Sequence, residues 1–142
     1  MFCWKIVADK KTTAKPAVIW KIFTDFEHMS KYMPTVESCK LEGPLAVGTK
    51  GIMKIKKDGM VCPFVITDLE KEKLYKDKTS FFGTNLRLTH KLANIDGMTQ
   101  ITHIFQVSGV LAPLMYFTMR KHMKKVVKDA VDNLASMAES NA

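Results

Sequence analysis

The feature that most constrains the fold of this 142-residue chain is the Asp96-Gly97 dipeptide. It lies between Leu86–His90 and Thr99–His103, two segments in which apolar and polar residues alternate as they do in a half-buried strand. Asp-Gly readily adopts the positive φ angles of a two-residue hairpin turn. The two segments are therefore predicted to pair as a tight antiparallel hairpin.

This turn also sets the register of the hairpin, because Ile95 must then face Met98. One face receives the pairs Leu92 with Ile101, His90 with His103, Leu88 with Phe105, and Leu86 with Val107. The other face receives Arg87 with Gln106, Thr89 with Ile104, and Lys91 with Thr102. One face is thus apolar apart from two histidines and the other is mostly polar, which is typical of a sheet covered on one side.

A second Asp-Gly pair, Asp58-Gly59, predicts another tight hairpin, between Met53–Lys56 and Cys62–Ile66. A two-residue turn there pairs Met53 with Phe64 and Ile55 with Cys62, which extends the apolar surface. Strand patterns also cover Phe2–Ala8, Thr35–Glu42 and Lys73–Phe82. The expected sheet has about seven strands, nearly all antiparallel.

Helical periodicity appears near the start of the chain. Pro16 suits the first turn of a helix, where its missing N–H costs nothing. The apolar face of this helix carries Ile19, Ile22, Phe23 and Phe26. A second short helix is expected over His28–Tyr32, before Pro34.

One long helix is expected at the end of the chain, at about Pro113–Glu139, with a length of roughly 40 Å. Its apolar side carries Met115, Met119, Met123, Val126, Ala130, Leu134 and Met137. Its opposite side carries Lys121, Lys124, Lys125 and Lys128. A helix of this kind needs a large apolar partner, and the apolar face of the sheet is the surface of that size.

The net charge of +8 comes almost entirely from lysines spread along the chain, since Arg87 and Arg120 are its only arginines. Nucleic-acid surfaces concentrate Arg and Lys on one face, so no nucleic-acid partner is expected. The tightest basic cluster is Arg120 with the four lysines of the long helix. It is expected to be a solvated face, and transient contact with an anionic membrane or an acidic partner is the alternative.

The three cysteines, Cys3, Cys39 and Cys62, are odd in number and have no CxxC spacing, which favours free thiols in a reducing compartment. The apolar runs are too short to span a bilayer, and no secretory signal pattern is visible. We therefore expect a cytoplasmic protein. No repeat or linker breaks the pattern, so residues 1–142 are expected to form one domain, as a monomer or homodimer.

The order of these elements resembles the START-like (SRPBCC) superfamily, which includes polyketide cyclase/dehydrase and lipid-transport proteins and Bet v 1-type allergens. The similar motifs are Lys15-Pro16-Ala17-Val18-Ile19-Trp20, Thr24-Asp25-Phe26-Glu27 with Pro34, Leu41–Thr49 with its Val47-Gly48-Thr49 end, and Gly97–His103. The resemblance covers essentially the whole chain. It implies an α+β helix-grip fold, in which a curved antiparallel sheet, two short helices and one long C-terminal helix enclose a cavity.

His90 and His103 are the sharpest functional candidates, because the register places them side by side on the apolar face. Buried polar groups are costly unless they are paired. Opposed histidines can satisfy each other structurally, anchor a polar group of a ligand, transfer protons or bind a metal. The sequence places no carboxylate or cysteine beside them, so neither a metal nor another cofactor is expected.

An apolar pocket is expected where the sheet and the long helix meet, and its methionines suit a site that adapts to its ligand. The predicted ligand-binding residues are His90, His103, Met53, Cys62, Phe64, Leu88, Phe105, Met115, Met119 and Met123. Ordinary core packing is the alternative for each apolar residue. Two functions stay open: binding or carriage of a small hydrophobic, lipid- or polyketide-like molecule, and a cyclase/dehydrase-type enzyme in which His90 or His103 moves protons.

Overall fold

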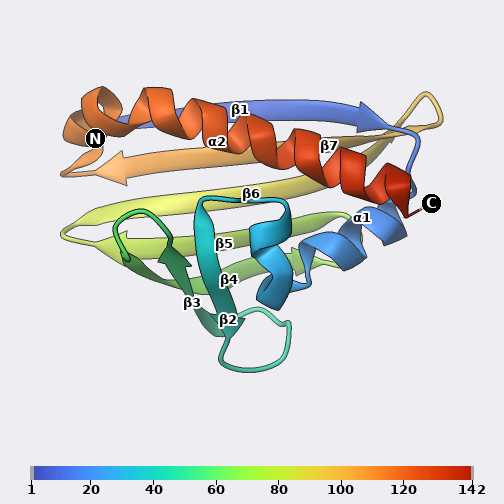
Figure 1. The fold of residues 1–142 in the computed structure, drawn as a ribbon. Helices are drawn as coiled ribbons and strands as arrows, with labels where there is room; N and C mark the ends of the chain where they lie inside the picture. The colour runs from blue at the N-terminus through green and yellow to red at the C-terminus, as the bar shows by residue number, and fades with distance from the viewer. Residues whose placement is uncertain (1, 142) are drawn as a thin grey trace.

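A computed structural model describes residues 2–141 of the chain as one sheet with helices on its concave side (Figure 1). The strands are β1 (Cys3–Thr12), β2 (Val36–Leu41), β3 (Lys50–Ile55), β4 (Val61–Glu70), β5 (Leu74–Phe81), β6 (Thr84–Ile95) and β7 (Met98–Gly109). The helices are α1 (Pro16–Phe23), the 3-10 helix η1 (Phe26–Lys31) and α2 (Ala112–Ser140).

The sheet has the order β1-β7-β6-β5-β4-β3-β2, and every neighbouring pair is antiparallel. It curves around α2, which runs along β1 and β7, while α1 and η1 lie in front of the other half of the sheet (Figure 1). The predicted α+β helix-grip arrangement is confirmed. No helix within residues 2–141 is long and apolar enough to cross a membrane.

The β6–β7 hairpin has the predicted register. Asp96 and Gly97 both have positive φ angles, 53° and 81°, and Ile95 faces Met98. The turn is held further by the side-chain oxygen of Asn94, which accepts a hydrogen bond from the Gly97 N–H at 3.2 Å. The predicted apolar face therefore forms along the whole hairpin, because no bulge interrupts the pairing.

The predicted register of the β3–β4 hairpin is wrong by two residues. Met53 pairs with Cys62, not Phe64, and Gly51 pairs with Phe64. The connection is a four-residue loop, 56–59, in which the Asp58 carboxylate accepts a hydrogen bond from the N–H of residue 60 at 3.0 Å. That side-chain contact favours a wider loop over a two-residue turn. Because the shift is an even number of residues, the same side chains still face the concave side.

The first helix ends earlier than its apolar pattern suggests. Asp25 has φ −81° and ψ 73°, which is outside the helical region, so α1 stops at Phe23. Phe26 belongs to η1, which occupies most of the predicted short helix at His28–Tyr32. Phe26 is nevertheless buried beside Phe23, with ring centroids 6.0 Å apart. The apolar pattern thus identified the buried face correctly but not the break in the backbone.

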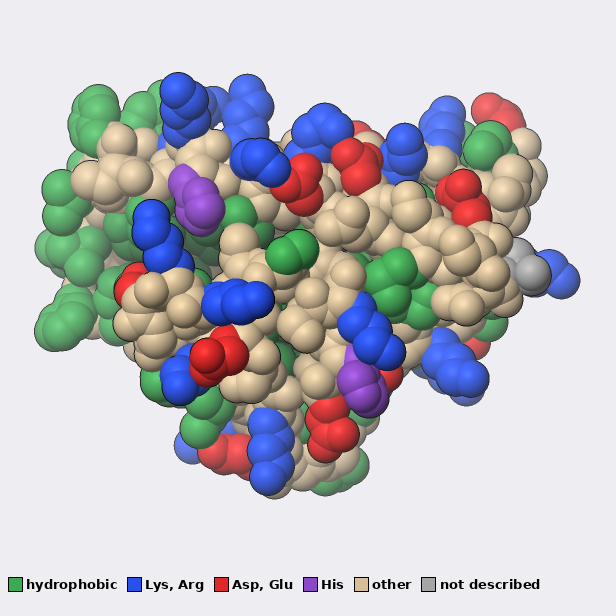
Figure 2. Space-filling model, viewed as in Figure 1, with side chains coloured by type: hydrophobic (Ala, Val, Ile, Leu, Met, Phe, Trp, Pro, Cys, Tyr) green, Lys and Arg blue, Asp and Glu red, His purple; other side chains and the backbone are tan. Residues whose placement is uncertain are grey.

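The long helix α2 is anchored at both ends. Trp4 Nε1–H donates a buried hydrogen bond to the Ala112 carbonyl at 2.8 Å, and the Thr12 hydroxyl donates to Glu139 at 2.6 Å. Its second half packs closely against the sheet and α1 through small and branched residues: Val127, Ala130, Val131, Leu134, Ala135 and Ala138. The four predicted lysines are exposed, and Figure 2 shows basic side chains along this edge of the molecule.

Candidate functional site

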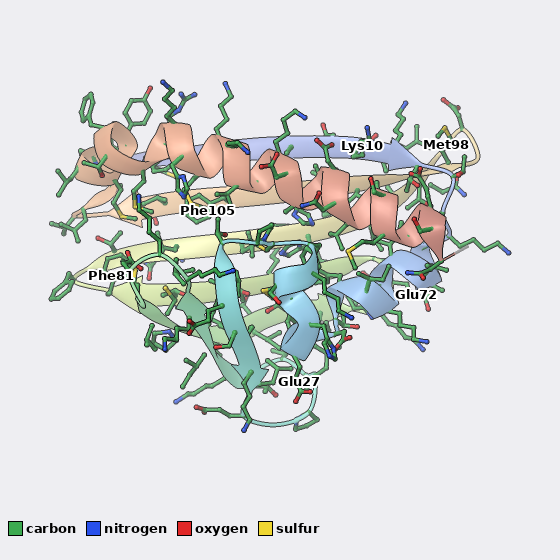
Figure 3. All side chains as sticks on the ribbon, in the orientation of Figure 1. Lys10, Glu27, Glu72, Phe81, Met98 and Phe105 are labelled. Atoms are coloured by element: carbon green, nitrogen blue, oxygen red, sulfur yellow. The ribbon has the colours of Figure 1, made fainter. Side chains whose placement is uncertain are left out.

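A cavity of about 100 Å³ lies between the concave face of the sheet and the middle of α2. Its walls come from β2 to β7, from α2 between Met123 and Ala130, and from the segment of α1 and η1 that begins at Phe23. The lining is overwhelmingly apolar. Figure 3 shows Phe105, one of the lining residues, in the space between β7 and α2.

Most of the ligand-binding residues predicted from the sequence line this cavity. They are His90, His103, Met53, Cys62, Phe64, Leu88, Phe105 and Met123. Met115 and Met119 do not: Met115 is buried in a separate apolar cluster with Trp4 and Ile6, and Met119 packs against the same cluster. The start of α2 lies over β1, so these two methionines fill core space at that end.

The two histidines lie together in the wall of the cavity. They are cross-strand partners on β6 and β7, with ring centroids 3.9 Å apart and ring planes at 82°. His90 is 5% exposed and His103 is 2% exposed. The Phe23 ring covers His90, also with a centroid distance of 3.9 Å. The edge-to-face contact between the two imidazoles and the tilted Phe23 ring together restrict the orientation of His90.

Both ring nitrogens of His90 lack a hydrogen-bond partner within the described part of the chain. Burial lowers the pKa of His90 well below its ordinary value, and the neighbouring His103 lowers it further. Burial likewise lowers the pKa of His103. Both imidazoles are therefore neutral at pH 7, and a neutral imidazole offers one donor and one acceptor. His90 thus carries two nitrogens without hydrogen-bond partners in an apolar wall, which destabilises the fold unless a bound group supplies a partner.

A carboxylate that the sequence did not point to lies in the same cavity. Asp77, on β5, lines it together with Tyr75, whose hydroxyl donates a hydrogen bond to Asp77 Oδ2 at 2.7 Å. Tyr75 is the cross-strand partner of His90, and their ring centroids lie 5.6 Å apart. Asp77 therefore lies in the same cavity lining as the two histidines, although the sequence alone did not place a carboxylate there.

Asp77 is electrostatically unusual. Burial raises the pKa of its carboxyl from 3.8 to about 7, against the opposing effect of the Tyr75 hydrogen bond. The side chain is only partly buried, and it belongs to the cavity lining. Burial also raises the pKa of Tyr75, and the charge of Asp77 adds to that shift. A carboxyl group that titrates near pH 7 can release or accept a proton under ordinary conditions.

A signal for Asp77 was present in the sequence. Tyr75, Asp77 and Thr79 alternate with Lys76 and Lys78, so the three share one face of the strand. The charged residues on both faces hid which face was buried. The pairing of Tyr75 with His90 shows which face of β5 is buried. That pairing depends on the β5–β6 register, which the structure supplies.

The cysteines are free thiols, as predicted. Cys39 and Cys62 line the cavity. Burial raises the pKa of Cys39 to about 12 and also raises the pKa of Cys62, so both stay protonated and poorly nucleophilic at pH 7. Among residues 2–141, no three His, Cys, Asp or Glu side chains are grouped as a metal site requires. The titratable groups of the lining that can exchange hydrogen bonds or protons with a ligand include the two histidines, Asp77 and Tyr75.

Solved structures with the same architecture exist at low sequence identity. The crystal structure of Ara h 8.0201 has a TM-score of 0.74 at 18% identity, covering 99% of this chain and 100% of its own. The Zhui aromatase/cyclase from Streptomyces sp. R1128 has a TM-score of 0.78 at 9% identity, covering 97% and 94%. Norcoclaurine synthase from Thalictrum flavum, solved with dopamine and hydroxybenzaldehyde, has a TM-score of 0.75 at 13% identity, covering 99% and 89%.

These likenesses show the fold alone. No curated protein sequence matches the chain. A family model does match it, over residues 4–139, which is nearly the full length of the chain. The matching family is described as polyketide cyclase / dehydrase and lipid transport. With its helix-grip fold and apolar cavity, the chain belongs to the polyketide cyclase/dehydrase and lipid-transport family.

Proposed function

We propose that this protein binds a small apolar molecule that carries at least one hydrogen-bonding group, in the cavity between the sheet and α2. The observation that carries this proposal is the pair of unpartnered nitrogens on buried His90. A hydroxyl group on a ligand can donate to the unprotonated nitrogen of a neutral imidazole or accept from the protonated one, so it can satisfy either of the two nitrogens. Asp77 offers a second polar contact in the same cavity.

The size of the cavity limits the occupant. An apolar cavity of about 150 Å³ holds a single benzene ring. The cavity here, about 100 Å³, is smaller than that, so a short branched chain suits it as it stands and a single ring requires a small movement of the walls. Met29, Met33, Met53 and Met123 line the walls, and flexible methionine side chains let the space grow for a longer ligand. We expect lipid- or polyketide-like molecules to fit after such a movement of the methionine side chains.

A matched pair of ligands tests this proposal. We expect 4-ethylphenol to bind more tightly than ethylbenzene in isothermal titration calorimetry, because only the phenol can engage His90. The His90→Asn and His103→Asn variants should each lose about 1–3 kcal/mol of affinity for the phenol, the value of a buried hydrogen bond, and little for ethylbenzene. His122→Asn, on the exposed side of α2, is the control. Equal affinity for the two ligands, or no effect of either cavity variant, would contradict the proposal.

A second candidate function is a cyclase/dehydrase-type reaction. The Tyr75–Asp77 pair favours it, because Asp77 gives the cavity a group of different acidity from the histidines. In such a dehydration, one group takes the proton next to a carbonyl while another protonates the departing hydroxyl, which leaves as water. A β-hydroxy ketone substrate followed by ultraviolet absorbance of the conjugated product tests this. His103→Asn and Asp77→Asn should then cut the rate by roughly 10²–10⁴ with binding nearly intact; no turnover by the wild type rejects this candidate and leaves the binding proposal standing.

A further inference from the structure

The molecule carries an exposed apolar surface at one end, away from the cavity lining. We define the apolar end as five side chains from four segments: Phe2, 47% exposed; Phe82, 84%; Val110, 75%; Leu114, 60%; and Phe117, 84%. Figure 2 shows hydrophobic side chains gathered at the end where α2 begins. Scattered exposed apolar residues are ordinary, but a cluster of aromatic ones on one surface marks an interaction site.

The fold brings these segments together by backbone contacts. The N–H of Val110 donates to the Gly83 carbonyl at 3.2 Å, which joins the end of β7 to the β5–β6 turn. The N–H of Gly109 donates to the Phe2 carbonyl at 3.4 Å, which joins the start of β1 to the same place. Phe2 then meets the first turns of α2 through Tyr116, with ring centroids 6.1 Å apart.

Phe82 has a backbone conformation that bulky aromatic residues seldom adopt. It has a φ of 46° and Gly83 a φ of 68°, so both central residues of the β5–β6 turn have positive φ. Asn, Asp and Gly suit such turns, whereas a bulky aromatic residue is an outlier there. Phe82 contributes little burial in exchange, since 84% of it is exposed. Strain together with exposure at a hairpin tip indicates a role in binding rather than in folding.

The segments that follow Phe81, which carry most of the apolar end, are poor in acidic residues. Between Lys78 and Lys128 the chain has a single acidic residue, Asp96, and the pairing of β6 with β7 places Asp96 at the opposite end of the sheet. At 100° per residue, Leu114 and Phe117 share the outer face of α2 with Lys121 and Lys124, which are exposed.

The basic row begins close to the apolar end. Lys121 lies about 6 Å beyond Phe117 along the helix axis and Lys124 about 10 Å beyond it. Lys125 and Lys128, the next two, form ion pairs with Asp129 and Asp132. Within the described chain, Lys121 and Lys124 have no such partner and remain available to an external anion.

We propose that the apolar end docks on an anionic lipid membrane, with Phe82 and Phe117 entering the headgroup–acyl boundary and Lys121 and Lys124 facing the phosphates. Interfacial elements of this kind enter by about 5–10 Å, which places lysines at this spacing at headgroup level. The inference is independent of what the cavity binds.

A membrane fits this surface better than a second copy of the chain. The apolar side chains project from a hairpin tip and a helix start, so they form a protruding surface rather than a groove. In a twofold dimer through this end, the basic rows of the two α2 helices would approach each other and repel. An anionic bilayer complements both the apolar groups and the lysines.

Co-sedimentation with vesicles tests the proposal on the intact chain. We expect binding to phosphatidylcholine vesicles that contain phosphatidylglycerol, weak binding to phosphatidylcholine alone, and loss of the difference at high salt. Phe117→Ser should lower the partition coefficient about tenfold. Lys121→Glu with Lys124→Glu should remove the preference for anionic vesicles. Val47→Ser, an exposed apolar residue in the β2–β3 loop, is the matched control.

Phe82→Asn separates docking from folding. Asparagine accepts a positive φ more readily than phenylalanine, so this variant should unfold at a higher temperature than the wild type while binding vesicles about tenfold more weakly. Three results would overturn the proposal: no binding to anionic vesicles, binding unaffected by Phe82→Asn and Phe117→Ser, or a wild-type dimer in analytical ultracentrifugation that these two variants dissociate.

Discussion

Replacement of Asp77 by Asn should stabilise the protein at alkaline pH and leave its stability unchanged at acidic pH. The Tyr75 hydroxyl donates a hydrogen bond to Asp77 Oδ2 at 2.7 Å in the wild type. The asparagine side chain has nearly the same shape as the carboxyl group, and its oxygen can still accept this hydrogen bond. The substitution therefore removes the charge from the cavity with little change in packing. Any pH-dependent difference between the two proteins then reports the titration of this one group.

The sign of the effect follows from the two pKa values. In the unfolded chain the carboxyl of Asp77 ionises near its ordinary pKa of 3.8, whereas in the folded protein it stays protonated until about pH 7. Between these values the unfolded state binds fewer protons than the folded state, so wild-type stability falls as the pH rises. The stability that the protonated Asp77 carboxyl contributes to the folded state is fully present below about pH 4 and is lost as the pH rises past about 7.

The shift from 3.8 to about 7 corresponds to an upper limit of about 4 kcal/mol. Asp77 is only partly buried, and partial solvation of the carboxylate lowers the cost of its ionisation. We therefore expect Asp77→Asn to raise the free energy of unfolding by about 1–3 kcal/mol at pH 8 and by close to zero at pH 4.

Urea unfolding followed by circular dichroism at several pH values between 4 and 8 measures this difference. Asp68→Asn, which removes an exposed carboxylate from the neighbouring strand β4, is the control for loss of a negative charge. A stability difference between wild type and Asp77→Asn that is the same at pH 4 and pH 8 would refute the reasoning. It would mean that the cavity does not raise the pKa of Asp77.

The buried histidines should have the opposite pH dependence. Burial lowers the pKa of both histidines in the folded protein, so the free energy of unfolding decreases as the pH falls below about 6.5. In urea unfolding at pH 5, His103→Asn should remove about 2 kcal/mol of this decrease. An unchanged pH profile in the variant would contradict this prediction. Gly51→Ala should weaken 4-ethylphenol binding in calorimetry, because the new Cβ would collide with the Phe64 ring in the cavity wall; wild-type affinity would show that the ring moves away freely. Gly97→Ala should cost about 1 kcal/mol in the same unfolding assay, since Gly97 has a φ of 81°, and Gly97→Asn should cost less; equal stability of all three proteins would argue against a strained turn.

The architecture was predictable because it depends on local and periodic features. Asp96-Gly97 set the turn and register of β6–β7, and alternation then placed His90 beside His103. The apolar periodicity of the last segment located α2 to within a residue at each end. These features act through the backbone and neighbouring residues, so a single sequence contains the information.

The errors arose where a side chain competes with the backbone preference or where packing chooses between apolar partners. Asp58 holds a four-residue loop where Asp-Gly alone suggests a two-residue turn. Met115 and Met119 lie on the predicted apolar side of α2, but the diagonal path of the helix over the sheet takes them to the Trp4 cluster rather than the cavity. Periodicity identifies an inward face and cannot say what lies opposite it.

The sequence by itself determined the strand pairing around the histidines, the long amphipathic helix and the apolar character of the enclosed face. Only the tertiary structure decided that Asp77 and Tyr75 join the histidines, because β5 is paired to β6 through a register that no local motif sets. It also decided that Phe2, Phe82 and Phe117 meet at one end. Such groupings arise from contacts between residues far apart in the chain, and their energies depend on burial that exists only in the folded state.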